Sequence, residues 1–423
     1  MSKPNIGFGA ADILLPDFQT VDGTRWAVVA CDQYTSEPQY WKRVEKTVKD
    51  VPSTLHMILP EVYLDESEQR IGKINQKMAE ILNDHLNAYP SAMICLVRTQ
   101  SDGRQRIGLI GAVDLETYDY HKGSESLTRA TEGTVLERIP PRVAIRRNAP
   151  LELPHVMLLI DDPRRTVIEP ILQAAHSRKP LYDFDLMLDG GHVCAYLLTE
   201  EEQTAALQAL SALITPDEME ARYGQRDLAP LLFAVGDGNH SLATAKATYE
   251  ELKQVIGTEA AQRHPARYAL AEVVNLHDTA LDFEPIFRAV FGCNPQDLLT
   301  ELEAYVHAQN GTASEQNILC ITQAEEKTIS VPHPTQQLTV GTLQAFLTDY
   351  CARHPKVTVD YIHGEDSLRS LINAPDRVGF LFDGMRKDEL FRTVIYDGAL
   401  PRKTFSMGHA QDKRYYLECR KIK

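Results

Sequence analysis

One segment limits the fold more tightly than any other part of the chain. Residues Leu231–Ile256 open with the apolar run Leu231–Val235, and the turn residues Gly236–Asn239 follow directly. Apolar residues then recur at steps of three and four: Leu242, Ala245, Tyr249, Leu252 and Ile256. A short apolar run bounded by turn residues is typical of a buried strand, whereas the longer repeat is that of a helix, with Gly257 at its end. The segment therefore predicts a strand, a glycine turn and a helix in succession.

The turn has the composition of an anion-binding site. The first turn of a helix offers backbone N–H groups without helical partners and carries the positive end of the helix dipole, so it attracts phosphate. Gly236 and Gly238 let the backbone come close to a ligand, and Asp237 with His240 forms an acid/base or metal-binding pair beside it. In the alternative interpretation, Asp237 or Asn239 only caps the helix and His240 is a surface residue. The strand–turn–helix context favours the functional interpretation.

The composition disfavours several classes of protein. The 423 residues suffice for two or three domains, and 43% hydrophobic with 24% charged residues is typical of a globular protein in water. The chain contains no apolar run of the ~18 residues that span a membrane. The N-terminal residues lack the apolar core of a signal peptide, so we expect a cytoplasmic protein with no membrane partner. A net charge of −15 disfavours nucleic-acid binding, which depends on a basic surface.

The seven cysteines also carry information about the class of protein. They are spread along the chain and never form a C-x-x-C pair. Several lie within apolar, strand-like runs, so we expect reduced core residues rather than disulfides or a zinc site.

Periodicity along the rest of the chain predicts a mixed α/β (α+β) fold, with mixed sheets and flanking helices. Residues 92–98 and 106–115 are predicted to form a hairpin, and Thr199 with Glu202 forms a capping box that starts a helix. Another helix is predicted to start at Thr215–Glu218, with Pro216 at its first position and Gly224 at its end. Four further predictions concern single elements: strands at Trp26–Cys31 and Phe391–Tyr396, and helices at Glu66–Tyr89 and Glu284–Phe291. We expect three domains: 1–125, 126–292 with the glycine turn, and 293–423.

Two other polar groups follow predicted strands. The sequence Asp189-Gly190-Gly191-His192 repeats the D-G-x-H pattern, but it joins predicted strands at 185–188 and 193–198. We therefore interpret it as a two-residue hairpin turn. Four polar residues stand at or near the end of the predicted strand 268–277: Glu272, Asn275, His277 and Asp278. We expect them to reach the same pocket as Asp237 and His240.

Two basic stretches are candidates for phosphate recognition, because the planar guanidinium group suits phosphate. The first, Leu127–Arg147, contains Arg129, Glu132, Arg138 and Arg142. The second is the tail Leu400–Lys423, where Arg402 and Lys403 stand beside Thr404. The alternative is that each stretch is simply a solvated surface.

The stretches Gly236–His240, Leu400–Thr404 and Thr128–Arg142 together resemble a large bacterial family named only as a domain of unknown function. The resemblance spans nearly the whole chain, and the D-G-[HN]-H turn opening an alanine-rich helix is the signature of that family. The same turn resembles the D-G-H-H-R motif of the free L-serine kinases, which belong to the superfamily of ParB and sulfiredoxin. Members of that superfamily bind nucleotide phosphates at such a helix N-terminus. The resemblance therefore implies a ParB/sulfiredoxin-like strand–turn–helix unit at the centre of the fold.

The serine-kinase motif matches this chain in part. Asp237, Gly238 and His240 correspond to its aspartate, its glycine and its second histidine. Asn239 replaces the first histidine and Ser241 replaces the arginine, so one charged phosphate contact is missing. Either nucleotide binding is weakened or lost, or another cation replaces that contact in space: Arg129, Arg142, Arg402 or Lys403.

The leading hypothesis is a phosphotransferase similar to free serine kinase, which uses ATP or ADP with Mg²⁺ to phosphorylate the hydroxyl of a small molecule. Asp237 and His240 are its catalytic candidates, with Asp237 holding magnesium or accepting the hydroxyl proton. Its cofactor-binding candidates are Gly236, Gly238, Asn239, Ser241, Arg129, Glu132, Arg142, Arg402 and Lys403. Two alternatives stay open: a phosphomonoester phosphatase of the phosphoserine type, and a non-enzymatic nucleotide-binding switch. The sequence identifies neither the substrate nor the oligomeric state.

Overall fold

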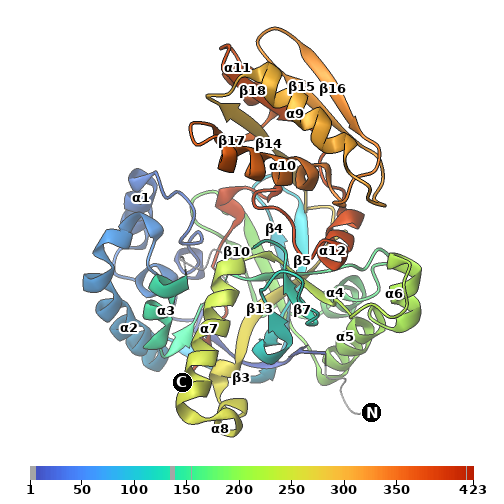
Figure 1. Cartoon of the computed structure of the whole chain (residues 1–423). Coiled ribbons are helices and arrows are strands. Elements are labelled where there is room, and N and C mark those ends of the chain that lie inside the picture. The colour runs from blue at the N-terminus through green and yellow to red at the C-terminus, as the bar shows by residue number, and fades with distance from the viewer. Residues whose placement is uncertain (1–5, 134–138, 154, 416) are drawn as a thin grey trace. The chain divides into compact units, whose positions relative to one another are not determined.

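The computed structural model describes residues 6–133, 139–153, 155–415 and 417–423. The chain forms two compact units (Figure 1). The first unit comprises Met1–Ala130, Thr134–Leu281 and Gly408–Lys423, and the second comprises Thr131–Gly133 and Asp282–Met407. The division into three domains at 1–125, 126–292 and 293–423 stays a prediction.

A ten-stranded mixed sheet organises the first unit. Its order is β10 (Tyr182–Asp185), β11 (His192–Leu197), β4 (Ile94–Thr99), β5 (Gln105–Asp114), β13 (Tyr268–Asn275), β9 (Met157–Ile160), β12 (Phe233–Asp237), β7 (Thr128–Ala130) and β6 (Tyr118–Asp119), with β1 (Phe8–Gly9) on β5. The pairs β13–β9, β12–β7 and β6–β7 are parallel, whereas β12–β9, β13–β5 and the remaining pairs are antiparallel. Two short pairs accompany it, β2 (Ala11–Pro16) with β3 (Leu86–Ala92) and β8 (Leu151–Glu152) with β20 (Arg420–Lys421).

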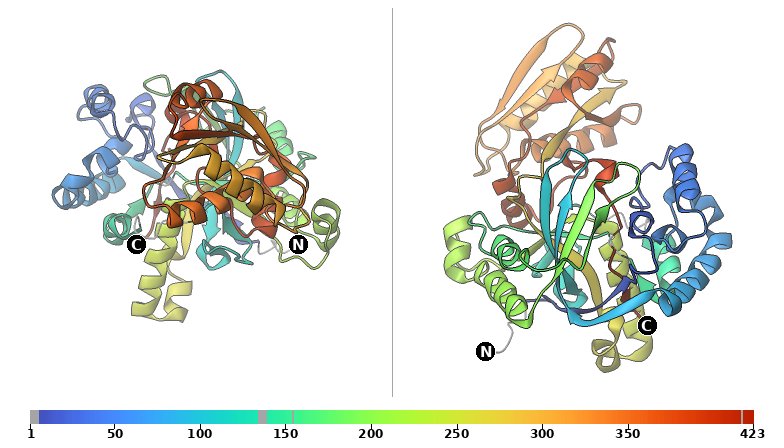
Figure 2. Two further views of the ribbon diagram at one scale, coloured as in Figure 1. Left: turned by 45° about the horizontal axis from the view of Figure 1, so that its top comes forward. Right: turned by 180° about the vertical axis from the view of Figure 1, so that it is seen from behind.

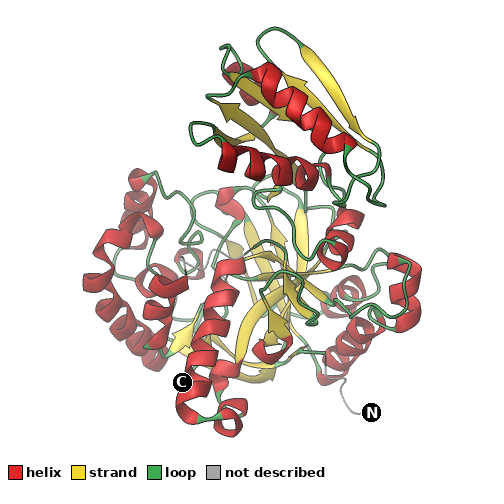
Figure 3. Ribbon diagram, viewed as in Figure 1, coloured by secondary structure: helices red, strands yellow, loops and turns green. Residues whose placement is uncertain are grey.

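Both faces of this sheet are buried, because alternate side chains of its central strands enter different hydrophobic clusters. On β5, Leu109 and Val113 belong to one cluster, whereas Ile110 and Ala112 belong to the other. The first cluster includes side chains of α4 (Ile168–Ala175), α5 (Glu200–Ala212) and α7 (Asn239–Ile256). The second includes β2 and α2 (Ser67–Asp84). The strands are thus enclosed by helices and shorter elements, as Figure 3 shows by colour.

The remaining helices of the first unit lie at its sides. Helices α1 (Pro38–Val48) and α2 lie on one side of the sheet, and α4, α5 and α6 (Pro216–Tyr223) lie on the other, as the front and back views show (Figures 1 and 2). Helix α3 (Ile139–Arg147) packs against α7, which is followed by the short helix α8 (Thr258–Gln262). The mixed α/β fold class predicted from periodicity is confirmed.

The second unit is built on a six-stranded antiparallel sheet. Its order is β16 (Glu326–Val331), β15 (Gln316–Ile321), β18 (Arg377–Leu381), β14 (Phe283–Phe291) and β17 (Thr358–His363), with β19 (Phe405–Met407) also on β14. Its helices are α9 (Pro295–His307), α10 (Thr339–Arg353), α11 (Glu365–Leu371) and α12 (Lys387–Tyr396).

Local capping signals predicted helix ends well. Thr199 accepts from the backbone of Glu202, which bonds back to it, so the capping box of α5 is confirmed. Helix α6 has Pro216 at its first position and ends at Gly224 with φ +84°, a left-handed conformation that glycine adopts without strain. The predicted hairpin is also confirmed, as β4 and β5.

Four single-element predictions differ from the structure. The run Trp26–Cys31 is not a strand: it forms a single bridge, between Val29 and Arg414, and the Trp26 carbonyl accepts instead from the hydroxyls of Ser53 and Thr54. Helix α2 ends at Asp84 rather than Tyr89, because the chain continues into β3.

The other two errors exchange helix and strand. Residues Phe283–Phe291 form β14, because this apolar run pairs with β17 and β18 on either side. Residues Phe391–Tyr396 belong to helix α12, whose buried side chains Leu390, Phe391 and Val394 follow the helical period.

Candidate functional site

The predicted strand, glycine turn and helix are confirmed. Strand β12 ends at Asp237, Gly238 takes a left-handed conformation with φ +80°, and α7 begins at Asn239. A Cβ atom at Gly238 would lie 2.2 Å from the carbonyl oxygen of His155, and one at Gly236 would lie 2.7 Å from Cγ of Leu159. Both glycines are therefore needed so that β12 and the turn can pack against β9 and the residues before it.

Asp237 is a partly buried carboxylate, with 18% of its side chain exposed, and it is held between Lys413 and His155. Its Oδ2 lies 3.1 Å from Nζ of Lys413 and 3.3 Å from Nε2 of His155, and its Oδ1 accepts the Gly238 N–H at 2.7 Å. Burial would raise the pKa of Asp237, but Lys413 and His155 outweigh this effect and hold the pKa well below its usual range. The carboxylate thus stays ionised, which suits a positioning role better than a role as proton acceptor.

His155 is bonded through both of its ring nitrogens. Its Nδ1 lies 2.8 Å from the carbonyl oxygen of Arg414, and its Nε2 faces the Asp237 carboxylate. The ring thus connects the end of β12 with the C-terminal segment that contains Lys413. Lys413 supplies the positive charge that faces the Asp237 carboxylate.

The first turn of α7 adds to this positive field. Gly238, at the N-cap, has no side chain to accept from the turn, and the first turn contains no acidic residue. Helices α5 and α6, in contrast, have threonine caps and acidic first turns. Asn239 donates through its Nδ2 to the Val235 carbonyl at 3.4 Å, back toward β12, and the His240 carbonyl accepts from the Thr244 hydroxyl at 2.7 Å. The positive end of an 18-residue helix therefore lies beside Asp237, Lys413 and His155.

A cavity of about 150 Å³ adjoins this turn. Ser241 and Leu242 of α7 line it, together with Val156, which follows His155, and Tyr415, which follows Lys413 and Arg414. Most of the remaining wall is apolar, and its charged side chains are Arg142, Arg146 and Glu152. The chain thus places a small, largely apolar pocket that is open on one side beside the Asp237 cluster, and such a pocket with a few polar groups is the usual form of a ligand site.

The predicted phosphate contacts fall into two groups. Arg129 is buried and donates to the carbonyls of Ser126 and Ala229, at 2.8 and 2.9 Å, and burial lowers its pKa. Arg142 lines the cavity and forms an ion pair with Glu61. Arg138 lies outside the described residues.

Glu132, Arg402 and Lys403 belong to the second unit and make their contacts there. Glu132 forms a bridge with Leu400, and the carbonyls of Arg402 and Lys403 accept from Arg288 at 3.2 Å. The Asp237 cluster, in contrast, is built from the first unit alone. A phosphate role for Glu132, Arg402 and Lys403 stays a prediction.

Sequence reasoning missed His155 and included Lys413 only within the basic tail Leu400–Lys423. His155 is 82 residues away from Asp237, and it lies two residues before the apolar strand β9. A polar residue at the border of an apolar strand was the available signal, but nothing in the local spacing connects it with Asp237.

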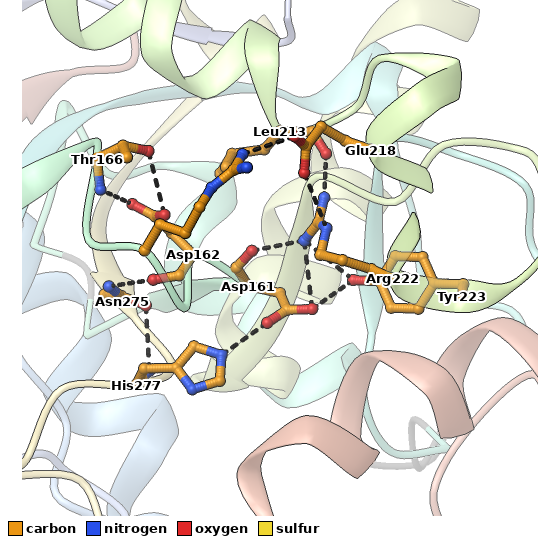
Figure 4. A network of polar contacts seen from close by, with 10 residues as sticks. Asp161, Asp162, Thr166, Leu213, Glu218, Arg222, Tyr223, Asn275 and His277 are labelled. Carbon is orange, nitrogen blue, oxygen red and sulfur yellow. Dashed lines mark hydrogen bonds and ion pairs between the residues drawn. The ribbon is translucent and has the colours of Figure 1, made fainter. Parts of the chain in front are cut away.

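A second polar cluster surrounds Asp161 (Figure 4). Its Oδ1 lies 2.7 Å from Nε2 of His277, and its Oδ2 accepts from the Tyr223 hydroxyl at 2.6 Å and lies 3.2 Å from Arg222. Burial would raise the pKa of Asp161, but bonds from His277 and Tyr223 lower it. Asn275 donates to the Asp162 carbonyl at 2.9 Å. The network joins α6 to the ends of β9 and β13.

The expectation that Asn275 and His277 reach the pocket of Asp237 is wrong. Asp237 pairs with Met157 at the start of β9, whereas Asn275 pairs with Ile160 at its end, so the two groups lie at opposite ends of that strand. Glu272 binds Arg106 inside the sheet, and Asp278 accepts from the backbone of Ile107. Polar residues at the end of one strand therefore serve separate structural tasks.

The second D-G-x-H motif is a connection between β10 and β11, as predicted, but it is longer than two residues. Leu188 and Asp189 have positive φ angles of 52° and 56°. His192 is bound on both ring nitrogens, by Asp183 at 2.6 Å and Asp185 at 2.7 Å. These bonds raise the pKa of His192 against the effect of burial.

The described residues contain no group of three or more His, Cys, Asp or Glu side chains that could hold a metal ion. All seven cysteines are free thiols, and four of them are buried: Cys95, Cys293, Cys320 and Cys419. Within the described ranges, no helix is both long and apolar enough to cross a bilayer.

The fold and the site define a mixed α/β protein with a cationic helix N-terminus beside a small cavity. The chain belongs to the family described as "Protein of unknown function (DUF1015)", whose model matches residues 16–350, as the glycine-turn motif predicted. No curated protein matches the chain.

Three solved structures are similar to the chain at low identity. A free serine kinase (E30A mutant) in complex with AMP is 11% identical, with a TM-score of 0.37, over 72% of this chain and 89% of that one. A conserved hypothetical protein from Pyrococcus furiosus is 10% identical, with a TM-score of 0.33, over 71% and 90%. C-terminally truncated SbnI from Staphylococcus aureus is 11% identical, with a TM-score of 0.33, over 71% and 82%.

Proposed function

We propose that this protein binds the phosphates of a nucleotide at the N-terminus of α7 and transfers a phosphoryl group to a hydroxyl of a small molecule in the adjoining cavity. One observation carries the proposal. The partly buried carboxylate of Asp237 holds Lys413 and His155, at 3.1 and 3.3 Å, beside the first turn of a long helix. Backbone N–H groups, a lysine and a helix dipole are the elements that bind phosphate in many unrelated sites.

The charge of the cluster supports an anionic ligand. Asp237 is paired with the ammonium group of Lys413, and the first turn of α7, which contains no acidic residue, adds positive potential. Ser241 occupies the position where the serine-kinase motif has an arginine, and Lys413 supplies a cation beside the same turn. The phosphate therefore receives its charged contact from a different part of the chain.

A protein-bound Mg²⁺ fits this cluster poorly. Both oxygens of Asp237 already have donors, Oδ1 from Gly238 and Oδ2 from Lys413 and His155. A metal ion would have to displace these groups, so we assign no step to a protein-bound metal. Asp237 instead fixes the positions of Lys413 and His155.

In the proposed reaction, the hydroxyl oxygen of the acceptor forms a bond to the terminal phosphorus of the nucleotide. The bond between that phosphorus and the bridging oxygen breaks, and the shortened nucleotide leaves with the electron pair. Lys413 and the first-turn N–H groups bind the charge that develops on the phosphate oxygens. His240, in the same turn, accepts the hydroxyl proton.

Binding and turnover measured together test this proposal. Thermal shifts are recorded with ATP, ADP and CTP, with and without Mg²⁺, for the natural protein and for Lys413→Met. Lys421→Met, a change of an exposed lysine on β20, is the matched control. We expect a nucleotide-dependent shift that Lys413→Met removes and the control keeps, together with transfer of phosphate to an acceptor.

Two other outcomes contradict the proposal in different ways. Release of inorganic phosphate from phosphoserine without a nucleotide identifies a phosphatase. A nucleotide shift without chemical conversion identifies a non-enzymatic switch.

A further inference from the structure

The cavity beside α7 has an unbalanced group of charges in its wall. Arg146 of α3 and Arg420 of β20 both bind the carboxylate of Glu152, at 2.5 Å to Oε2 and 2.8 Å to Oε1. Burial would raise the pKa of Glu152, but Arg420 and Arg146 lower it, so the carboxylate is ionised. Two guanidinium groups thus share one negative charge.

Arg146 is the member of this group that a ligand can reach. It lines the cavity, whereas Arg420 is buried and donates its other N–H groups to the carbonyls of Pro265 and Tyr268. The second arginine of the wall, Arg142, is already paired with Glu61. The carboxylates of Glu61 and Glu152 are both bound to arginine, so the wall favours an anionic group over an ammonium group.

The rest of the cavity is apolar or neutral. Its wall includes six apolar side chains from five segments: Met57, Leu59, Met78, Ile145, Leu153 and Leu242. Cys31 and Tyr415 also line it, and burial raises the pKa of Cys31 to about 12 and that of Tyr415 well above its usual range. Its volume of about 150 Å³ equals that of an apolar cavity that holds one benzene molecule.

We propose that the cavity binds a small monocarboxylate with a compact apolar body, its carboxylate on Arg146. This inference rests on the proposed function in one respect: the bound molecule is the phosphoryl acceptor and presents its hydroxyl to the first turn of α7, at Ser241. The acceptor is thus an apolar hydroxy acid. A zwitterionic amino acid such as serine lacks the apolar body, and its ammonium group would meet arginines instead of a carboxylate.

Three probes separate the features of this ligand. The first is 2-hydroxy-4-methylpentanoate, which has the carboxylate, the hydroxyl and the apolar body. The second, 4-methylpentan-1-ol, has the apolar body and a hydroxyl but no carboxylate. The third, L-serine, has the polar groups but no apolar body. Isothermal titration calorimetry on the full chain measures their affinities. We expect the hydroxy acid to bind roughly tenfold or more tightly than either of the others, because only it makes both kinds of contact.

Two variants locate the binding. Arg146→Met removes the reachable guanidinium but leaves Glu152 paired with Arg420, so the fold keeps its buried ion pair. Arg147→Met is the matched control, because its side chain is 58% exposed and pairs with Glu251 on α7 rather than lining the cavity, whereas that of Arg146 is 16% exposed. Ala149→Leu fills the cavity from its wall. Affinity for the hydroxy acid should fall in Arg146→Met and Ala149→Leu and stay unchanged in Arg147→Met.

The outcomes for the cavity and for the phosphotransferase are distinguishable. Equal binding of L-serine and the hydroxy acid, or binding that Arg146→Met leaves intact, overturns the cavity assignment, even if serine is phosphorylated. Hydroxy-acid binding that depends on Arg146, without transfer from any nucleotide, supports the cavity assignment and overturns the phosphotransferase. Absence of binding by all three probes overturns the assignment.

Discussion

Two aspartates lie at opposite ends of β9, each bonded to a histidine, and their surroundings differ. Asp161 is buried and bound by Tyr223, Arg222 and His277, and Arg222 also approaches Glu218 at 4.0 Å, so one arginine is shared between two carboxylates. Asp237 is partly buried and faces Lys413 and His155 at one oxygen, beside the uncapped start of α7. An Asp–His pair alone therefore does not identify a site; the balance of charge around it does.

The largest expected effect is on the free energy of unfolding, at the Asp161 end of β9. Asp161→Ala leaves Arg222, with a side chain only 15% exposed, without this carboxylate. Breaking a buried ion pair on one side costs about 3–5 kcal/mol of the free energy of unfolding. Urea unfolding of the variant measures the loss. A loss well below this range would mean that the Asp161 network contributes little to stability and that the contrast with Asp237 is not real.

At the Asp237 end of β9, the expected effect is on the rate of phosphoryl transfer. Lys413→Met leaves Asp237 paired with His155, so the fold should change little in stability. The rate of phosphoryl transfer should fall by roughly a hundredfold, because an electrostatic contact to the reacting phosphate is lost. Steady-state kinetics of the two variants, corrected for folded fraction, compare the two ends directly. A rate that falls more in Asp161→Ala than in Lys413→Met would reverse the comparison.

Another acid, Glu418, is buried and accepts from a tyrosine hydroxyl, and it shows how burial changes the pKa of a carboxyl group. Burial raises its pKa to about 7, although the Tyr182 hydroxyl donates to it at 2.5 Å. Because the folded protein holds this proton more tightly than the unfolded chain, the free energy of unfolding should fall between about pH 4.5 and pH 7, by about 3 kcal/mol. Glu418→Gln should remove this fall. The measurement is urea unfolding from pH 5 to pH 8, and a parallel pH dependence in both proteins would contradict the assignment.

The smallest expected effect concerns the Asp161 network again and tests the contribution of a single hydrogen bond to its stability. Tyr223→Phe removes one neutral donor to Asp161 and leaves Arg222 and His277 in place. A single hydrogen bond of this kind contributes about 1 kcal/mol to stability, and nucleotide binding at the other end of β9 should not change. Thermal shifts with and without nucleotide measure both. A change in nucleotide affinity would show that the two ends are coupled.

The sequence predicted those features that a few neighbouring residues determine. The turn at Gly238 and the caps of α5 and α6 depend on backbone geometry within one or two helical turns, so spacing alone was sufficient. The fold class followed from the same patterns.

The features that failed depend on distant partners. The run Phe283–Phe291 suits a helix or a strand, and its pairing with β17 and β18 decides between them. The side chains that contact Asp237 are His155 and Lys413, which belong to separate segments of the first unit. No local pattern shows that these residues converge. Arginines and lysines from the more conspicuous basic stretches were therefore predicted in their place.

The route of the chain has a consequence for how the protein is made. The chain leaves the first unit after Leu281 and returns to it with Gly408–Lys423, a segment that contains both Lys413 and Arg420. A ribosome that adds residues from the N-terminus must therefore finish the entire second unit before either cation can reach its carboxylate. The nascent first unit carries the Asp237 turn without its lysine, so the proposed phosphate site comes into existence only when synthesis has passed both units.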